Sequence, residues 1–410
     1  MRATGIASTR RQRLLTGAAV AMVAIASAWL SYELYRLIRQ PASIGPLAVH
    51  EGGVDLKILH AMVTDWFAGS PVYTGPHGGR HPHPPASMAI LWPVHGWTSI
   101  AVSMVVYLSV TMAALAWIVV VAVRESGAAS SPGRALMALV PLATYPAGAT
   151  IGNGQTTVYV LAALLAALLV LRDRPRGWSR DLAVAALLLV ALAKPNVSAP
   201  FVLVALVMAG GLRPVALLVG AYAALTLFAA SFQPPGLREQ FAYFLAHSSR
   251  ISAQLGENDV HGLLAWLGLQ GWLAGASLAA LVLLALWLWR HRRCDPWLLM
   301  GVTALGARLW TYHRWYDDLL IVIPLIALFR IAKADAGAVP PDPRAGALFA
   351  ATLVLLLAPG GLYLLPPPWN RAYLLAQALV WITVMGFLAL LARRERADPD
   401  RRRSAPATDG

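Results

Sequence analysis

The sequence of 410 residues is 58% hydrophobic and only 13% charged, so it has far more apolar surface than one soluble core buries. Its apolar runs of roughly 18 to 20 residues match the length that a helix needs to cross the hydrocarbon of a membrane. The runs are continuous rather than alternating, which excludes a β-barrel and predicts an all-α polytopic membrane protein. The net charge of +14 then serves to orient the chain and indicates no nucleic-acid partner.

We predict about twelve membrane spans, separated by short polar connections. They cover residues 14–32, 98–123, 135–150, 156–171, 181–193, 197–211, 214–231, 264–289, 297–310, 317–331, 346–365 and 372–392. The domains expected are a basic amino-terminal segment over 1–13, one transmembrane domain over 14–392 and a disordered tail over 393–410. The first span also resembles a signal peptide, but its apolar run continues past the Ala26-Ser27-Ala28 cleavage pattern.

The distribution of basic residues predicts how the chain is oriented. With the amino terminus inside, 23 of the 33 Lys and Arg residues fall on the cytoplasmic side, as the positive-inside rule requires. Both termini are therefore predicted to be cytoplasmic, and loops 33–87 and 232–262 to lie outside. These and the shorter outer connections hold 9 of the 19 acids, so chemistry is expected on the outer face. The single cysteine, Cys294, lies in a basic connection and is expected to be a free cytoplasmic thiol.

The first outer loop is the longest polar interval in the chain. Apolar residues recur at helical spacing over 54–67, which predicts an amphipathic helix on the outer interface with Asp55 at its start. Asp55 is then either a helix cap or first-turn acid, which the local sequence favours, or a functional carboxylate. The prolines that follow exclude regular structure until about Met88.

Histidines 77, 81 and 83 form the only obvious metal-ligand pattern of this loop, a His-x-His pair with one neighbour. A third ligand at defined spacing is missing, so a zinc site is the weaker interpretation. Hydrogen bonding to a sugar or phosphate, or simple exposure to water, is favoured.

Several charged residues lie near the outer ends of predicted spans. Lys194 precedes Pro195 and either extends to the headgroups or belongs to a site. Arg308 lies in an apolar run and needs a partner, which is Asp317, Asp318 or a substrate phosphate. The two aspartates point about 100° apart on a helix, so we interpret them as salt-bridge partners of Arg308 or of Arg314 rather than as a metal site.

The order of these features along the chain resembles the bacterial glycosyltransferase family 87, which are polyprenol-phosphate-mannose-dependent mannosyltransferases of the GT-C superfamily. The resemblance extends from about residue 14 to 390. Each motif is weak alone, and their order at the outer ends of spans is the stronger signal. The motifs are Asp55, Gly69-x-Pro71-x-Tyr73, Pro84-Pro85, Gly154-Gln155, Lys194-Pro195, Asn258 with Gly262, and Trp310-x-x-His313.

The resemblance implies an inverting enzyme of the bacterial inner membrane that acts on the periplasmic side. The donor would be a polyprenyl-phosphate hexose, with mannose expected, and the acceptor a lipid- or glycan-linked sugar. Asp55 would be the base and His313 part of the donor site, with no metal cofactor. Two departures concern the details, since His81 and His83 replace the family's aromatic residues and Gly306-Ala-Arg308-Leu309 replaces its usual Ser-Pro-x-Ser.

One carboxylate suits this reaction, because a phosphate leaving group needs cationic stabilisation but no general acid. The residues expected at the donor phosphate and sugar are Lys194, Arg308, His313, Arg314 and Gln155. Those expected at the acceptor or loop site are Tyr73, His81, His83 and Asn258. For Gln155, simple turn chemistry is the alternative.

Two other functions fit a polytopic protein with broken helices. A transporter or lipid flippase would show inverted repeats and charges near the bilayer midplane, and neither is evident. An O-antigen ligase or polymerase would be expected to carry its large outer loop late in the chain, whereas the largest loop here comes first.

Overall fold

The computed structural model describes residues 2–39, 51–74, 83–255, 259–311, 313–333, 342–361 and 365–397. Within them every named element is a helix, which confirms the all-α prediction for this part of the chain. In chain order the elements are α1 (Arg2–Arg39), α2 (Val54–Phe67), α3 (Pro85–His95), α4 (Ile100–Glu125), α5 (Ser131–Ala143), α6 (Tyr145–Asn153), α7 (Thr157–Asp173), α8 (Trp178–Ala191), α9 (Pro195–Val207), α10 (Leu212–Ala230), α11 (Leu237–Leu255), α12 (Val260–Trp266), η1 (Gln270–Trp272), α13 (Leu273–His291), α14 (Pro296–Trp310), η2 (Trp315–Ile321), α15 (Val322–Lys333), α16 (Pro343–Leu356) and α17 (Trp369–Ala397).

The number of membrane spans stays a prediction. Among the described residues, five helical segments are long and apolar enough to cross a membrane: 13–39, 100–125, 212–230, 270–291 and 369–397. A sixth is counted if α6 and α7, which meet at a bend of 120°, form one broken span. Each of the twelve predicted intervals contains helix, but several helices are shorter than a span because proline or glycine interrupts the run.

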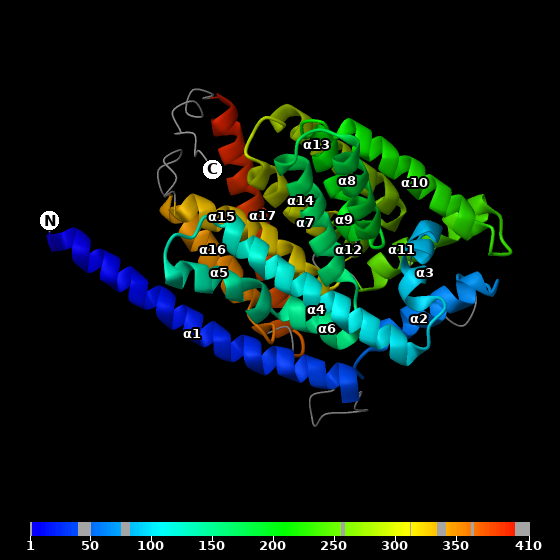
Figure 1. Ribbon diagram of the computed structural model, residues 1–410, viewed down its shortest axis with the longest axis horizontal. Coiled ribbons are helices and arrows are strands. Elements are labelled where there is room, and N and C mark those ends of the chain that lie inside the picture. The colour runs from blue at the N-terminus through cyan, green and yellow to red at the C-terminus, as the bar shows by residue number, and fades with distance from the viewer. Residues whose placement is uncertain are drawn as a thin grey trace.

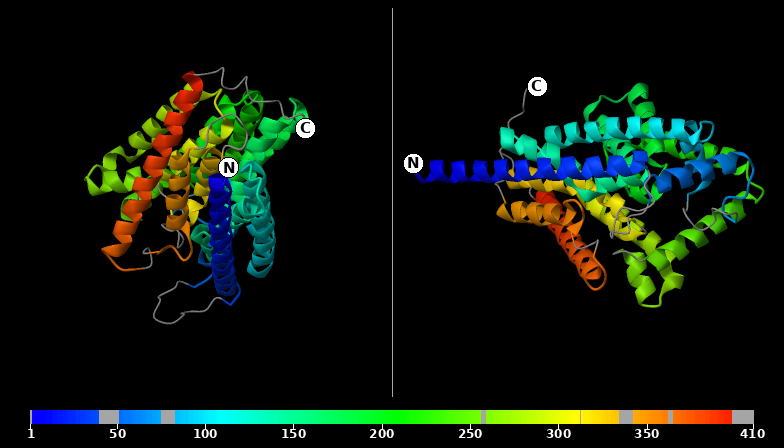
Figure 2. Two further views of the ribbon diagram at one scale, coloured as in Figure 1. Left: turned by 90° about the vertical axis from the view of Figure 1, so that its left-hand side faces the viewer. Right: turned by 90° about the horizontal axis from the view of Figure 1, so that it is seen from below.

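Different helices lie at the two ends of the molecule. The start of α1 and the end of α17 lie toward one end, whereas α2, α3 and α11 lie toward the other (Figures 1 and 2). Helix α2 is therefore remote from the start of α1 and from the end of α17.

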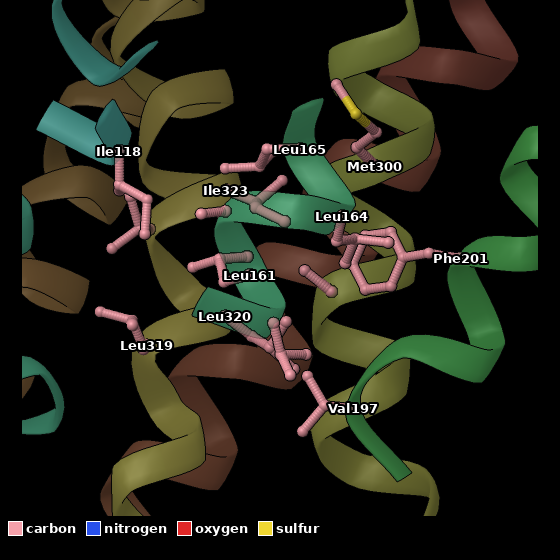
Figure 3. Packing of buried hydrophobic residues seen from close by; sticks show 14 of the residues in the cluster. Ile118, Leu161, Leu164, Leu165, Val197, Phe201, Met300, Leu319, Leu320 and Ile323 are labelled. Atoms are coloured by element: carbon pink, nitrogen blue, oxygen red, sulfur yellow. The ribbon is translucent and has the colours of Figure 1, made fainter. Parts of the chain in front are cut away.

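The core lies around α7, whose residues are buried on nearly every side. Such an all-round apolar helix is typical of the centre of a bundle. Labelled side chains of α4, α7, α9, α14, η2 and α15 point toward one another around it (Figure 3). The outer helices α10, α13 and α17 carry exposed leucine, valine and tryptophan side chains instead, as lipid-facing helices do.

Helix α1 continues to Arg39, past the predicted end of the first span at residue 32. The continuation brings two buried charges into contact, because Arg36 Nη1 lies 2.6 Å from Glu33 Oε2. Arg36 Nη2 also donates to Asn153 Oδ1 at 3.2 Å, at the end of α6. The polar end of α1 is thus attached to the connection between α6 and α7.

Helix α2 confirms the predicted helix with the same bounds of 54 and 67, whereas its place on the outer interface of the membrane stays a prediction. Its apolar face is buried against protein. Trp66 Nε1 donates to the Ala229 carbonyl of α10 at 2.8 Å, and Gln233 Nε2 donates to the Trp66 carbonyl at 2.8 Å. The second predicted loop, 232–262, contains the amphipathic helix α11, which the sequence pattern did not lead us to expect, and α3 begins at Pro85 rather than near Met88.

The turn between α6 and α7 touches the start of α2. Gly154 closes α6 with φ of +77°, in the left-handed region. A Cβ atom at this position would overlap the Cβ of Leu56 in α2. The glycine is therefore required both by the backbone conformation and by the close approach of the two helices.

Replacing Gly154 by alanine tests this contact against a matched glycine. Gly127 also has a positive φ, +64°, but a Cβ there would meet nothing within 4 Å. We expect Gly127→Ala to cost about 1 kcal/mol of backbone strain, and Gly154→Ala to cost a further 1–3 kcal/mol, roughly, from overpacking. Unfolding of the two purified variants in detergent measures the difference, and equal losses would contradict the contact.

Candidate active site

Asp55 lies in the first turn of α2, after Gly53 as the N-cap residue. The Gly53 backbone N–H donates to the Gly152 carbonyl at 2.8 Å, so the end of α6 fixes where α2 begins. The half-buried Asp55 side chain interacts electrostatically with the Tyr107 hydroxyl of α4. Asp55 is thus a first-turn acid rather than the cap itself, a position in which the helix dipole favours the ionised carboxylate.

Gln155 connects this region to a buried polar cluster. Its backbone carbonyl and that of Thr150 lie 3.0 and 2.9 Å from the Tyr107 hydroxyl, which donates to them. Its side-chain Nε2 donates to the Tyr316 hydroxyl at 3.1 Å, and its Oε1 accepts from Lys194 Nζ at 3.3 Å. The Gly154-Gln155 turn therefore contributes a polar side chain to the interior as well as a change of direction.

Lys194 is the centre of the cluster and is buried. Its Nζ donates to Asp317 Oδ1 at 2.5 Å, to Thr157 Oγ1 at 3.0 Å and to Gln155, and it lies 4.5 Å from the centre of the Tyr316 ring. The Thr157 hydroxyl donates to the same Asp317 oxygen at 2.7 Å. A lysine ammonium has three N–H donors, so these three contacts use all of them. Lys194 does not extend to the headgroups.

Arg308 is fully buried and forms an ion pair with Asp318, as its place in an apolar run predicted. Asp318 also accepts from the hydroxyl of Tyr145. The Arg308 guanidinium lies 4.9 Å from the Trp381 ring centre, and Gln377 Nε2 donates to the Tyr145 hydroxyl at 3.0 Å. This second cluster joins α6, α14, η2 and α17.

The adjacent aspartates face different partners. Asp317 contacts Lys194 and Asp318 contacts Arg308, so the prediction that only one of them serves a given site is confirmed. They lie in the 3-10 helix η2, in which successive side chains are about 120° apart. The other predicted partner, Arg314, is half-buried, and its backbone N–H donates to Asp317 Oδ2 at 3.2 Å.

His313 lies in the connection between α14 and η2 and is fully buried. Its ring interacts electrostatically with Asp317, Arg308 and Lys194. Burial lowers the pKa of His313 to about 4, so the imidazole is neutral near pH 7. Nδ1 then donates to the Thr311 carbonyl at 2.8 Å, and Nε2 is an acceptor with no hydrogen-bond partner among the described residues. Such an atom can accept a hydroxyl of a bound molecule.

Two predicted acceptor residues lie at the opposite end of α2 from Asp55. The Tyr73 hydroxyl donates to the His83 carbonyl at 2.6 Å, and the Tyr73 ring packs edge-on against Trp66 at 5.5 Å. Trp66 is eleven residues along the helix from Asp55, or roughly 16 Å at 1.5 Å per residue. The structure therefore does not bring Tyr73 and His83 to the start of α2.

The other residues predicted for this part of the site, His81 and Asn258, lie outside the described residues, as does His77. Within the described residues no group of three or more His, Cys, Asp and Glu side chains is placed to hold a metal ion.

Sequence reasoning missed the polar residues that complete the two clusters. Thr157 carries a weak signal, because it follows Gln155 at the outer end of an apolar run. Tyr316 and Tyr145 carry none, since isolated tyrosines near span ends are typical of the interfacial belt. Gln377 is a polar residue between apolar neighbours of α17, which is itself an indication that it faces a partner inside the bundle.

Comparison with known protein families assigns the chain to a family. The model of glycosyltransferase family 87 matches residues 82–311, which is more than half of the chain. The chain belongs to glycosyltransferase family 87. It is therefore a membrane glycosyltransferase, a class distinct from the transporter considered above. No curated protein and no solved structure matches the chain.

The matched range covers the cluster residues Gln155, Lys194 and Arg308. It begins after Asp55 and ends before His313, so the match bears on the family and not on the roles of these two residues.

Replacing Lys194 by methionine is expected to be strongly destabilising. The change leaves the buried Asp317 without its cation, which costs roughly 3–5 kcal/mol in comparable pairs. Lys57→Met is the matched control, because Lys57 pairs with Glu51 at 2.5 Å but both side chains are well exposed, at 38% and 46%. We expect the control to change stability by less than about 1 kcal/mol.

Thermal unfolding in detergent measures both variants, with Lys194→Met/Asp317→Asn as a third. The double variant should recover part of the loss, because it has no uncompensated buried charge. A Lys194→Met variant as stable as Lys57→Met would contradict the structural role of the pair.

Proposed function

We propose that this enzyme transfers a hexose, with mannose expected, from a polyprenyl-phosphate donor to a lipid- or glycan-linked acceptor on the periplasmic face of the bacterial inner membrane. The observation that carries the proposal is the connection between Asp55 and the buried cations. The start of α2 is bonded to the end of α6, and the following turn provides Gln155 to the Lys194 cluster. A carboxylate and a cationic region are thereby held on one framework.

Asp55 is the proposed general base. Its carboxylate is half-buried, so an acceptor hydroxyl can reach it, and its place in the first turn of α2 favours the ionised form. Removing the proton as the acceptor oxygen attacks makes that oxygen a better nucleophile. Attack opposite to the departing phosphate inverts the anomeric centre, which one carboxylate suffices to support.

The donor phosphate is proposed to lie at the segment that begins with His313 and Arg314. The departing phosphate gains negative charge, and cationic donors aimed at it lower the barrier. Lys194 and Arg308 are occupied by Asp317 and Asp318, so their contribution is to hold this segment and to provide a positive environment. Arg314, which is half-buried, is the side chain best placed to meet the phosphate directly.

His313 is proposed to recognise the sugar rather than the phosphate. As a neutral imidazole that donates from Nδ1, it offers only a lone pair at Nε2. A lone pair repels a phosphate oxygen but accepts a sugar hydroxyl. The reaction is proposed to need no metal, because the leaving group is stabilised by side-chain cations.

Asp55→Asn tests the base. We expect the variant to fold and insert normally and to lose transfer by roughly 10²- to 10⁴-fold, the usual contribution of a general base. Asp65→Asn is the control, because Asp65 lies on the same helix, three turns further on. Transfer from a radiolabelled polyprenyl-phosphate sugar, measured with purified enzyme, distinguishes them. Near-normal turnover of Asp55→Asn, or an equal loss in both variants, would rule out the assignment.

His313→Gln tests the sugar contact. We expect the KM for the donor to rise roughly tenfold, the cost of one lost hydrogen bond in a buried site. The wild-type KM should show no His313-dependent change between pH 6 and 8, since a pKa of about 4 keeps the imidazole neutral throughout. His291→Gln is the control, because His291 is also buried and also bonds a carbonyl through Nδ1, at 2.8 Å.

The alternative role for His313, as a cation that binds the phosphate, predicts a different pH dependence of the donor KM. If His313 were a cation on the phosphate, the donor KM would rise as the pH increases from 6 to 8, and this rise would disappear in His313→Gln. Kinetics of the two enzymes over this range decide between the two roles.

A further inference from the structure

A cavity of about 510 Å³ lies between the starts of α8 and α10. Its lining includes Arg176, Arg180, Asp181, Gly210, Leu212 and Arg213. The far end of α10 contacts α2 through Ala229, and α10 is roughly 28 Å long at 1.5 Å per residue. The cavity is therefore on the other side of the bundle from the candidate active site and has no part in the proposed transfer.

Three arginines surround a single carboxylate in this cavity. Arg180 is buried, and its Nη2 donates to Asp181 Oδ1 at 2.6 Å and to the Gly210 carbonyl at 3.0 Å. Arg213 forms an ion pair with the other Asp181 oxygen. A Cβ atom on Gly210 would lie 2.8 Å from Arg180 Nη2 and 3.0 Å from Arg176 Nε, so these two guanidinium groups lie side by side.

The lining therefore has an excess of two positive charges. Asp181 compensates one of the three guanidinium groups, and the remaining repulsion is relieved when an anion lies between them. The starts of α8 and α10 add to this field, because their N-cap residues, Gly177 and Gly211, provide no side-chain cap. The positive ends of both helix dipoles lie at this region.

The cavity opens beside an apolar surface. Trp178 and Leu182 on α8, and Leu212 and Val219 on α10, are all largely exposed, as lipid-facing side chains are. The guanidinium of Arg213 lies 4.6 Å from the Trp178 ring centre, at the boundary between the charged and apolar parts. A ligand that fills both parts has a phosphate at one end and hydrocarbon at the other.

We propose that this cavity binds the phosphate headgroup of an anionic phospholipid of the phosphatidylglycerol class, with its acyl chains along the exposed faces of α8 and α10. Basic cavities between membrane helices are known to take such headgroups, and bidentate arginine contacts suit phosphate oxygens. The positive-inside distribution of charge predicts that the lipid comes from the cytoplasmic leaflet.

The test compares two double variants of the full-length protein in neutral detergent. Arg176→Gln/Arg213→Gln removes two cavity arginines. Arg174→Gln/Arg292→Gln is the matched control, because Arg174 is in the same connection without lining the cavity. Arg292 lies 4.2 Å from the ring centre of Trp289, much as Arg213 lies on Trp178. Both variants lose two positive charges, so a general electrostatic effect would weaken lipid binding equally in the two.

Binding is measured by native mass spectrometry, with phosphatidylglycerol, phosphatidylcholine and inorganic phosphate as separate probes. We expect phosphatidylglycerol to bind the wild type and the control alike, and the cavity variant at least about tenfold more weakly, from the loss of charged hydrogen bonds. Phosphatidylcholine and inorganic phosphate should bind all three proteins weakly. Equal phosphatidylglycerol binding by the two variants overturns the proposal.

Two further results would also overturn it. If phosphatidylcholine bound as tightly as phosphatidylglycerol, the site would not distinguish an anionic headgroup from a zwitterionic one. If inorganic phosphate bound as tightly as phosphatidylglycerol, the cavity would be a site for a soluble anion. If the double variant does not fold, Arg176→Gln alone replaces it, since Arg176 is exposed and removing it leaves both ion pairs of Asp181 intact. The single variant is expected to bind phosphatidylglycerol several-fold more weakly, and unchanged binding would count against the site.

Discussion

The buried ion pair between Lys194 and Asp317 determines how the centre of this bundle is built. Lys194 caps the start of α9, and its other contacts, Thr157 and Gln155, lie at the start of α7 and in the turn before it. Helix ends leave backbone groups without intrahelical partners, which is costly in an apolar interior unless polar groups are nearby. The pair lies where these broken helices meet. Asp317 Oδ2 accepts the backbone N–H of Arg314 at the start of η2, and Lys194 joins Asp317 to the side chains of Thr157 and Gln155. An unpaired charge at either position would be strongly destabilising in this buried region.

The second pair, Arg308 and Asp318, extends the same constraint to the segment that follows α14. Consecutive aspartates on η2 are held by cations from different helices, so this short element cannot rotate without breaking one of the two pairs. His313 lies two residues before the start of η2, so the two ion pairs that hold η2 also fix the position of His313. The buried imidazole, with one nitrogen bonded to Thr311 and the other without a hydrogen-bond partner among the described residues, thus depends on the two ion pairs rather than on local sequence.

Much of this could be predicted from the sequence, and the exceptions have physical causes. Helical periodicity predicted α2 with its correct bounds, and the cost of an unpaired charge predicted a partner for Arg308. Lys194 was ambiguous, because a lysine before proline at a span end also fits a headgroup contact, and its partner is 123 residues away. Tyr73 lies at the other end of α2 from Asp55, because this helix separates residues that a loop would allow to meet, and its role at the acceptor or loop site stays a prediction. The number of membrane spans is also difficult to predict, because the prediction depends on the length of apolar runs and several of these runs form short, broken helices.

The close approach of Gly154 to Leu56 bears on the proposed role of Asp55 as the base. A general base acts only when the acceptor oxygen, the proton and the anomeric carbon are aligned, and a displacement of about 1 Å reduces the rate markedly. The position of Asp55 relative to the cation cluster is set by the Gly53–Gly152 hydrogen bond and by helix packing over Gly154. These are short contacts between helix ends, which do not depend on the conformation of a long loop. In the proposed mechanism, the base and the donor-binding segment would therefore keep their separation while the acceptor is exchanged.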